Sequence, residues 1–247
     1  MNFFVLCLSA IVLGVSSVQI VIVNRCLQTI WPGIQGSTLP ENGGFQLNAG
    51  QTRTTNVPNQ WSGKIWARTG CNNNMSYCET GFCGNNVQCL GSGGSPPTSL
   101  AEFTLGGFGN QDYYDVSLTD GYNRQVTIQP IIGSYSSSGG QYECKEAGEC
   151  QSNILLNCSQ PLRLLNSKGV TVGCHSACTK FNTDQYCCCG AFSIPESCMP
   201  SNWPVNSATS FKEQCPTAYS YEFDDQLGSF FCKGINGRSA NYRVTFC

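Results

Sequence analysis

The sequence predicts a mainly β protein held together by disulfide bonds. Short runs of alternating apolar and polar residues, bounded by Gly, Pro, Asn and Ser, recur along the chain, whereas helical periodicity is hard to find. The 247 residues also contain 18 cysteines, a density typical of proteins whose thiols are oxidised outside the cytosol. We therefore expect a sandwich or barrel that is covalently stapled.

Six segments carry the clearest strand pattern. At the C-terminal end, Tyr242, Val244 and Phe246 alternate with Arg243 and Thr245, which gives one apolar and one polar face, as in a half-buried strand. The six predicted strands are residues 19–23, 64–68, 100–105, 113–118, 125–130 and 242–247.

The first residues have the pattern of a secretion signal. Residues 1–17 form an uncharged apolar run that ends in small residues, which fits a signal peptide cut near Ser17. A transmembrane anchor is the alternative, but the run is short for a bilayer, and polar residues follow at Asn24 and Arg25. We expect a secreted, soluble, extracellular protein.

Composition argues against a nucleic-acid ligand and a metal. Charged residues make up 11% of the chain, the formal charge is −2, and no run of Lys and Arg occurs. One histidine, His175, cannot build a zinc site with spaced partners, and we expect a structural role for it. The sequence predicts no metal, no cofactor and no nucleic-acid partner, and we expect a monomer.

The cysteines are crowded into two regions. One lies between Cys71 and Cys89 in an Asn- and Gly-rich stretch, and the other runs from Cys144 to Cys215. We interpret these as stapled regions attached to a β core. The predicted core comprises residues 18–70, 90–150 and 216–247, with a small cystine-rich loop lobe at 71–89 and a larger cystine-rich lobe at 151–215.

Several segments resemble the thaumatin-like family, in the pathogenesis-related group that includes osmotin and zeamatin. The resemblance is carried by IVNRC at 22–26, GKIWARTGC at 63–71, LAEF at 100–103, DYYDVSLTDG at 112–121, CPTAYSY at 215–221 and NYRVTFC at 241–247. It implies a flattened two-sheet β-sandwich core, a cystine-rich lobe with short helices, a small cystine-rich loop lobe, and a cleft between the core and the larger lobe.

The resemblance also implies a disulfide pairing, with Cys189 left over. Cys189 is then either a buried free thiol or a competitor of Cys188 for Cys198. The implied pairs are Cys26–Cys247, Cys71–Cys78, Cys83–Cys89, Cys144–Cys232, Cys150–Cys215, Cys158–Cys174, Cys178–Cys187 and Cys188–Cys198.

An acidic cleft is the third implication of the resemblance. Lys64 stands where the family usually has arginine, and Arg68 follows it on the same face of the same strand, so we expect both to contact a ligand. The acids that align with the cleft of the family are Glu102, Asp115, Asp120 and Asp224.

Two functions are left open by these residues. The first is a secreted defence-type protein that binds β-1,3-glucan of fungal or other cell walls, or microbial membranes, through the cleft and inhibits growth. The second is a weak endo-β-1,3-glucanase, in which Glu102 donates a proton and Asp115 or Asp120 acts as nucleophile or base. The alternative to both is structural, a salt-bridged network that only positions strands.

Two Asn-x-Ser sequons occur, at Asn74 and Asn157. In the second, Cys158 is the middle residue, and its expected disulfide hinders modification. We therefore expect a glycan at Asn74.

Overall fold

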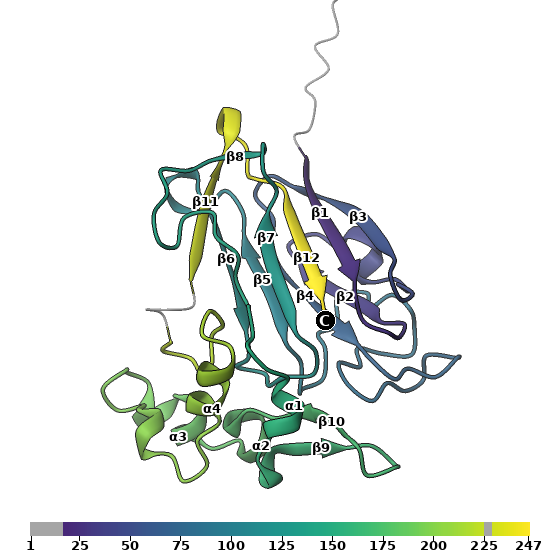
Figure 1. The fold of residues 1–247 in the computed structure, drawn as a ribbon, viewed down its shortest axis with the longest axis vertical. Helices are drawn as coiled ribbons and strands as arrows, with labels where there is room; N and C mark the ends of the chain where they lie inside the picture. Colours follow the sequence, from purple (N-terminus) through teal and green to yellow (C-terminus); the bar gives the residue numbers. More distant parts are fainter. Residues whose placement is uncertain (1–16, 225–228) are drawn as a thin grey trace, which may run out of the picture.

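A computed structural model describes residues 17–224 and 229–247 as two packed β-sheets with a disulfide-rich lobe at one end (Figure 1). The predicted leader, residues 1–17, lies outside the described residues except for Ser17. One sheet has the order β3 (Thr52–Pro58), β1 (Ser17–Asn24), β12 (Tyr242–Phe246), β7 (Val126–Pro130). The other has the order β2 (Trp31–Gly36), β4 (Ser62–Arg68), β5 (Leu100–Thr104), β6 (Asp112–Ser117), β11 (Phe230–Gly234), β8 (Tyr135–Ser136).

All six predicted strands are present, each within two residues of its expected bounds, as β1, β4, β5, β6, β7 and β12. β2 was not among the predicted strands; its sequence WPGIQG contains one proline and two glycines, residues that are depleted in strands. The structure shows why a glycine stands in this strand: a Cβ on Gly33 would lie 2.4 Å from the ring of Trp66 on the paired strand β4. The glycine leaves room for that ring.

The core lies between the two sheets. Phe103 of β5 and Tyr114 of β6 contact Tyr242 of the opposite sheet, with ring centroids 5.3 and 5.2 Å apart. Tyr242 also donates its hydroxyl hydrogen to buried Asp112 at 2.8 Å. Because side chains alternate along a strand, burial of Phe103 and Tyr114 turns their neighbours Glu102 and Asp115 to the outer face of the sheet.

Short helices and one hairpin gather beyond the ends of the strands, at the bottom of Figure 1. Side chains cap three of these helices: Asn153, Ser176 and Asn206 each accept a hydrogen bond from a backbone N–H of the first turn. The elements are α1 (Ile154–Asn157), α2 (Ala177–Phe181), α3 (Asp184–Cys187), α4 (Ser207–Gln214), β9 (Arg163–Leu165) and β10 (Thr171–Cys174).

Single 3-10 turns connect other parts of the chain. They are η1 (Pro40–Gly43), η2 (Phe108–Asn110), η3 (Gln160–Leu162), η4 (Gly190–Phe192), η5 (Pro200–Asn202) and η6 (Ile235–Gly237). No helix within residues 17–224 and 229–247 is long and apolar enough to cross a membrane.

Among residues 17–224 and 229–247, eight disulfides link the chain in the pairs that the resemblance implies. Cys26–Cys247 joins positions 221 residues apart, next to the parallel pair of β1 and β12. The others are Cys71–Cys78, Cys83–Cys89, Cys144–Cys232, Cys150–Cys215, Cys158–Cys174, Cys178–Cys187 and Cys188–Cys198.

Cys189 has a free thiol, but the expectation that this thiol is buried is wrong. Cys188 ends α3 in the left-handed region, with φ 52°, and it is buried in its bond to Cys198. The chain turns at that point, so Cys189 is exposed, with its Sγ 3.3 Å from Oδ1 of Asp184. The hydrogen bond to this carboxylate and its negative charge raise the pKa of the Cys189 thiol, which makes a reactive thiolate less available.

Candidate functional site

A row of polar side chains crosses the outer face of the six-stranded sheet. Lys64 of β4 is paired in register with Glu102 of β5, and Glu102 with Asp115 of β6. Gln35 of β2 is paired with Lys64 and extends the row to the next strand. Directly opposite residues in an antiparallel pair have Cβ atoms about 4.5–5.5 Å apart, so the ammonium group and the two carboxyl groups are close neighbours.

Three adjoining cavities follow this row towards the lobe. The first, of about 440 Å³, is lined by Gln35, Lys64, Glu102 and Asp115 among others. Glu102 and Asp115 also line the second, of about 270 Å³, together with Ser117, Thr119, Tyr219 and Glu222. Thr119 and Glu222 line the third, of about 140 Å³, which Asp120 borders as well. Since neighbouring cavities share walls, we treat them as one feature, the acidic groove.

Burial and like charge raise the pKa of Asp115 and of Glu102. Burial, and then the adjacent Glu102, raise the pKa of Asp115 to about 8. Burial also raises the pKa of Glu102, but Lys64 opposes that rise, as does a hydrogen bond with Ser117. Two neighbouring carboxyl groups lose their protons in sequence. Because Lys64 stabilises the Glu102 carboxylate, Glu102 ionises first and Asp115 keeps its proton.

Asp120 and Glu222 extend the negative charge towards the lobe. Burial raises the pKa of Asp120, again opposed by Lys64, and the charges of Asp120 and Glu222 both raise the pKa of Glu102. The sequence predicted Asp120 but not Glu222. Glu222 lies in a loop, where no strand or helix period could have assigned it to a face.

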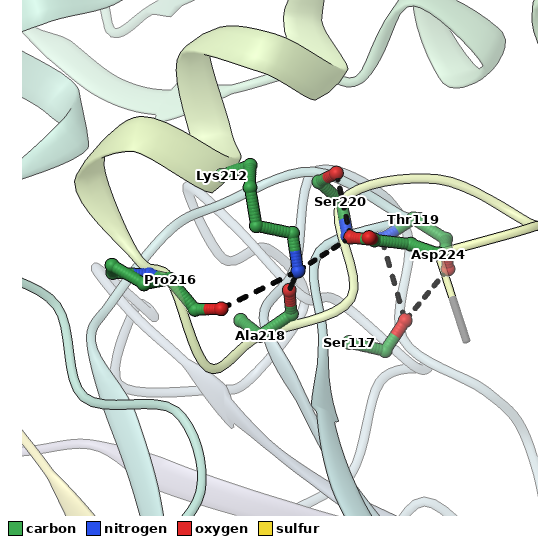
Figure 2. A network of polar contacts seen from close by, with 7 residues as sticks. All are labelled: Ser117, Thr119, Lys212, Pro216, Ala218, Ser220 and Asp224. Atoms are coloured by element: carbon green, nitrogen blue, oxygen red, sulfur yellow. Dashed lines mark hydrogen bonds and ion pairs between the residues drawn. The ribbon is translucent and has the colours of Figure 1, made fainter. Parts of the chain in front are cut away.

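Asp224 does not line the acidic groove. Its Oδ2 lies 2.7 Å from Nζ of Lys212 on α4 and accepts hydrogen bonds from the backbone N–H and the hydroxyl of Ser220, both at 2.8 Å (Figure 2). Lys212 also donates to the carbonyl of Ala218 at 2.7 Å. The inclusion of Asp224 among the cleft acids is therefore corrected: α4 supplies a partner that holds this carboxylate in a structural ion pair.

The expectation that Arg68 contacts a ligand is also corrected. The side chain of Arg68 is buried beneath the loop that follows Cys71 and cannot reach a ligand in the groove. It is completely buried, and its guanidinium group donates to the carbonyls of Trp31, Asn86 and Val87. Burial lowers its pKa to about 10. The stapled loop after Cys71 folds over this end of β4, where the indole of Trp66 donates to Gly81. Of the two predicted cations, Lys64 lines the groove.

The expected salt-bridged network is found only at Asp224. In the described part of the chain, ion pairs join Arg53 to Glu41 and Lys212 to Asp224, and none links Lys64 to the acids beside it. The structural alternative therefore fits Asp224 but not the row on the sheet.

His175, for which we expect a structural role, and the predicted glycan site Asn74 do not line the acidic groove. His175 is half-buried, with Nδ1 3.3 Å from Oγ1 of Thr179, and burial lowers its pKa. No group of three His, Cys, Asp or Glu side chains suited to a metal ion occurs within the described ranges. Asn74 is exposed, and its Oδ1 accepts a hydrogen bond from the Ser76 hydroxyl at 2.8 Å.

The comparisons with known proteins agree on one family. A model of the thaumatin family matches residues 24–247. Pathogenesis-related protein 5 of Arabidopsis thaliana is 46% identical over 229 residues, covering 91% of this chain and 87% of that protein. Pathogenesis-related thaumatin-like protein 3.5 of Cryptomeria japonica is 41% identical over 232 residues, covering 92% and 88%.

A solved structure shows that the fold is shared more widely. A laminaripentaose-producing β-1,3-glucanase in complex with laminaritetraose superposes with a TM-score of 0.60 at 11% identity, covering 93% of this chain and 98% of that chain. At that identity the likeness concerns the fold alone. From the family match and the identities above, the chain belongs to the thaumatin family.

Proposed function

We propose that this protein is a secreted defence protein that binds β-1,3-glucan of microbial cell walls through the acidic groove and thereby inhibits growth. The observation that carries the proposal is the row of Lys64, Glu102 and Asp115 at the floor of an open groove. Relatives named as pathogenesis-related proteins support the defence role. The glucanase of similar fold is described with laminaritetraose, a property of that protein which guides our choice of test ligand.

The groove has the chemistry to hold sugar hydroxyls. The carboxylate of Glu102 accepts hydrogen bonds, the Lys64 ammonium donates them, and the protonated Asp115 can do both. All three side chains stand on paired strands, so the sheet fixes their spacing before a ligand arrives. Preorganised polar groups in an open, elongated groove suit a polysaccharide chain better than a compact small molecule.

Binding is tested by sedimentation of the purified protein with insoluble β-1,3-glucan, with cellulose as the comparison polysaccharide. We expect retention on the β-1,3-glucan and its loss in the double variant Lys64→Met/Glu102→Gln. Glu213→Gln is the matched control, because Glu213 is exposed on α4 and does not line the groove. Equal retention of the wild type and the double variant would overturn the proposal.

The membrane alternative has its own assay. Leakage of a dye from vesicles, by protein that does not bind β-1,3-glucan, would replace the polysaccharide proposal with a membrane one. Inhibition of hyphal growth by wild type but not by the double variant would connect glucan binding to defence.

A second function, weak hydrolysis of β-1,3-glucan, is favoured by the different protonation of the two neighbouring carboxyl groups. Asp115 would donate its proton to the glycosidic oxygen as the bond to the anomeric carbon breaks. Glu102 would attack that carbon, or activate a water that does. This reverses our expectation from the sequence, which made Glu102 the acid, because Lys64 favours the ionised form of Glu102.

Hydrolysis is measured as new reducing ends on a linear β-1,3-glucan. We expect Asp115→Asn and Glu102→Gln each to abolish cleavage. Wild type that binds glucan without producing reducing ends would leave the binding function and remove the enzymatic one.

Secretion and glycosylation belong to the same proposal. Eight disulfides need an oxidising compartment to form and persist. N-terminal sequencing of protein from the medium should begin near Val18. Deglycosylation should reduce its mass, and Asn74→Gln should remove that difference.

A further inference from the structure

The third cavity of the acidic groove combines carboxylates with aromatic rings. Asp120 and Glu222 stand on its wall together with the rings of Tyr186, Trp203 and Tyr221, in a volume of about 140 Å³. No lysine or arginine is among the described residues that line it. We call this part of the groove the aromatic pocket.

The rings of the aromatic pocket are held in place by the lobe. Trp203 lies between the two tyrosines, with centroids 5.5 Å from Tyr186 and 5.8 Å from Tyr221, at interplanar angles of 80° and 90°. Such edge-to-face contacts are favourable. Trp203 also belongs to a buried cluster that includes the disulfide of Cys188 and Cys198. The pocket is therefore a rigid feature of the fold.

Trp203, which lines this pocket, has an indole N–H without an acceptor among the described residues. Trp203 is 7% exposed, and its Nε1–H is buried with no hydrogen-bond partner among the described residues. A buried N–H without an acceptor is destabilising, and ordinary buried indoles find one.

The charges around the pocket are unbalanced. Within residues 17–224 and 229–247, neither Asp120 nor Glu222 takes part in an ion pair. Lys64 is the cation that acts on Asp120, and it must also balance Glu102. Burial raises the pKa of Asp120, so a second positive charge at this position would stabilise the carboxylate.

We propose that the aromatic pocket binds the protonated amine of an amino sugar, so that the groove prefers a β-glycan with free amino groups over a neutral one. An ammonium group is attracted both to aromatic faces and to carboxylates. The pocket is smaller than the roughly 300–1,000 Å³ of sites for whole drug-sized ligands, and it opens into the groove, where neighbouring sugars of the chain would lie. The inference rests on the proposed binding of a polysaccharide in the groove.

The test is a comparison of three oligosaccharides of equal length by calorimetry at low salt, at a pH where the amine is protonated. They are a glucosamine oligomer, its N-acetylated counterpart and a laminari-oligosaccharide. Acetylation removes the charge but keeps the sugar chain. We expect the free amine to bind about tenfold more tightly than the acetylated oligomer, a factor that lies between those of an exposed and of a fully desolvated cation–π contact. Equal affinities would overturn the proposal.

Variants locate the effect in the pocket. Glu222→Gln should remove the preference for the amine, whereas Glu213→Gln, a matched change at an exposed position of α4 that does not line the pocket, should keep it. Glu222 is exposed, so this change spares the core. The indole N–H resonance of Trp203, identified by its loss in Trp203→Phe, should shift on addition of the glucosamine oligomer. A preference that survives Glu222→Gln, or an unmoved Trp203 resonance, would contradict the assignment.

Further outcomes distinguish the amino-sugar inference from the β-1,3-glucan proposal and from a protein ligand. If the glucosamine oligomer binds and the laminari-oligosaccharide does not, the aromatic pocket stands and the β-1,3-glucan proposal fails. If the laminari-oligosaccharide binds and the glucosamine oligomer binds no more tightly than its acetylated counterpart, the β-1,3-glucan proposal stands and the amino-sugar inference fails. A short lysine-containing peptide that binds as tightly as the glucosamine oligomer would overturn the amino sugar in favour of a protein ligand.

Discussion

Glu102 of β5 and Asp115 of β6 are register partners on the outer face of the six-stranded sheet. Their neighbours Phe103 and Tyr114, also paired, fill the core behind them. This places two carboxyl groups side by side above an apolar layer, where two negative charges are unfavourable. The pair therefore keeps a proton well above the pH at which a free aspartate would lose it.

The stability of the protein should fall as pH rises because of Asp115. Its pKa is about 8 in the folded chain, against an ordinary value of 3.8. Between these values the folded chain binds a proton that the unfolded chain releases, so the free energy of unfolding decreases by up to about 1.4 kcal/mol per pH unit. The stabilisation from the Asp115 proton is fully present below pH 3.8, the ordinary pKa, and it is lost as the pH rises through about 8, the pKa in the folded chain.

Asp115→Asn should flatten this decline. Urea unfolding at a series of pH values between about 4 and 8 measures the slope for each protein. Glu102→Gln, the neighbouring change, should flatten it in the same direction because the pKa of Glu102 is also raised. If Asp115→Asn kept the slope of the wild type, the assignment of the proton to Asp115 would be wrong.

Removal of the Asp224 carboxylate should weaken the fold without weakening glucan binding. The partly buried ion pair with Lys212 and the bonds from Ser220 would be lost, and we expect Asp224→Asn to cost about 1–3 kcal/mol in the free energy of unfolding. A double-mutant cycle with Lys212→Met measures the coupling between the two. Loss of glucan binding in correctly folded Asp224→Asn would return Asp224 to the binding site.

Arg68→Lys should destabilise the protein although it keeps the positive charge. The guanidinium group donates to four carbonyls on two segments of the chain, and an ammonium group cannot reproduce that geometry. We expect a loss of at least about 2 kcal/mol in chemical unfolding, from carbonyls left without donors. Wild-type stability, or reduced glucan affinity at unchanged stability, would show that Arg68 acts in the groove instead.

The disulfides should differ in their contributions according to the length of chain they close. Replacement of Cys26 and Cys247 by serine opens a bond between positions 221 residues apart, whereas Cys71–Cys78 spans 7. Loss of the first should cost about 2–5 kcal/mol, and loss of the second less, because loop-closure entropy grows with loop length. Guanidinium unfolding of the two double variants compares them. A larger effect at Cys71–Cys78 would contradict the entropic explanation.

Much of the fold could be predicted because its signals are local. Alternation places Tyr242, Val244 and Phe246 on one face of a strand whatever that strand is paired with. β2 was not predicted because one of its glycines, Gly33, weakens the strand pattern. This glycine leaves space for the ring of Trp66, which lies on the paired strand β4. A sequence pattern does not show what a glycine makes room for.

The sequence by itself determined the β architecture, the cysteine-rich regions and, through its resemblance to a family, the disulfide pairs and the acids Glu102, Asp115 and Asp120. Only the tertiary structure decided which charges meet. Packing of α4 places Lys212 beside Asp224, and the loop after Cys71 buries Arg68. A loop distant in sequence from β5 and β6 places Glu222 on the wall of the groove. Strand register and desolvation then set the order in which Glu102 and Asp115 lose protons. Charge interactions depend on distance and burial, and both are properties of segments that lie far apart in the sequence.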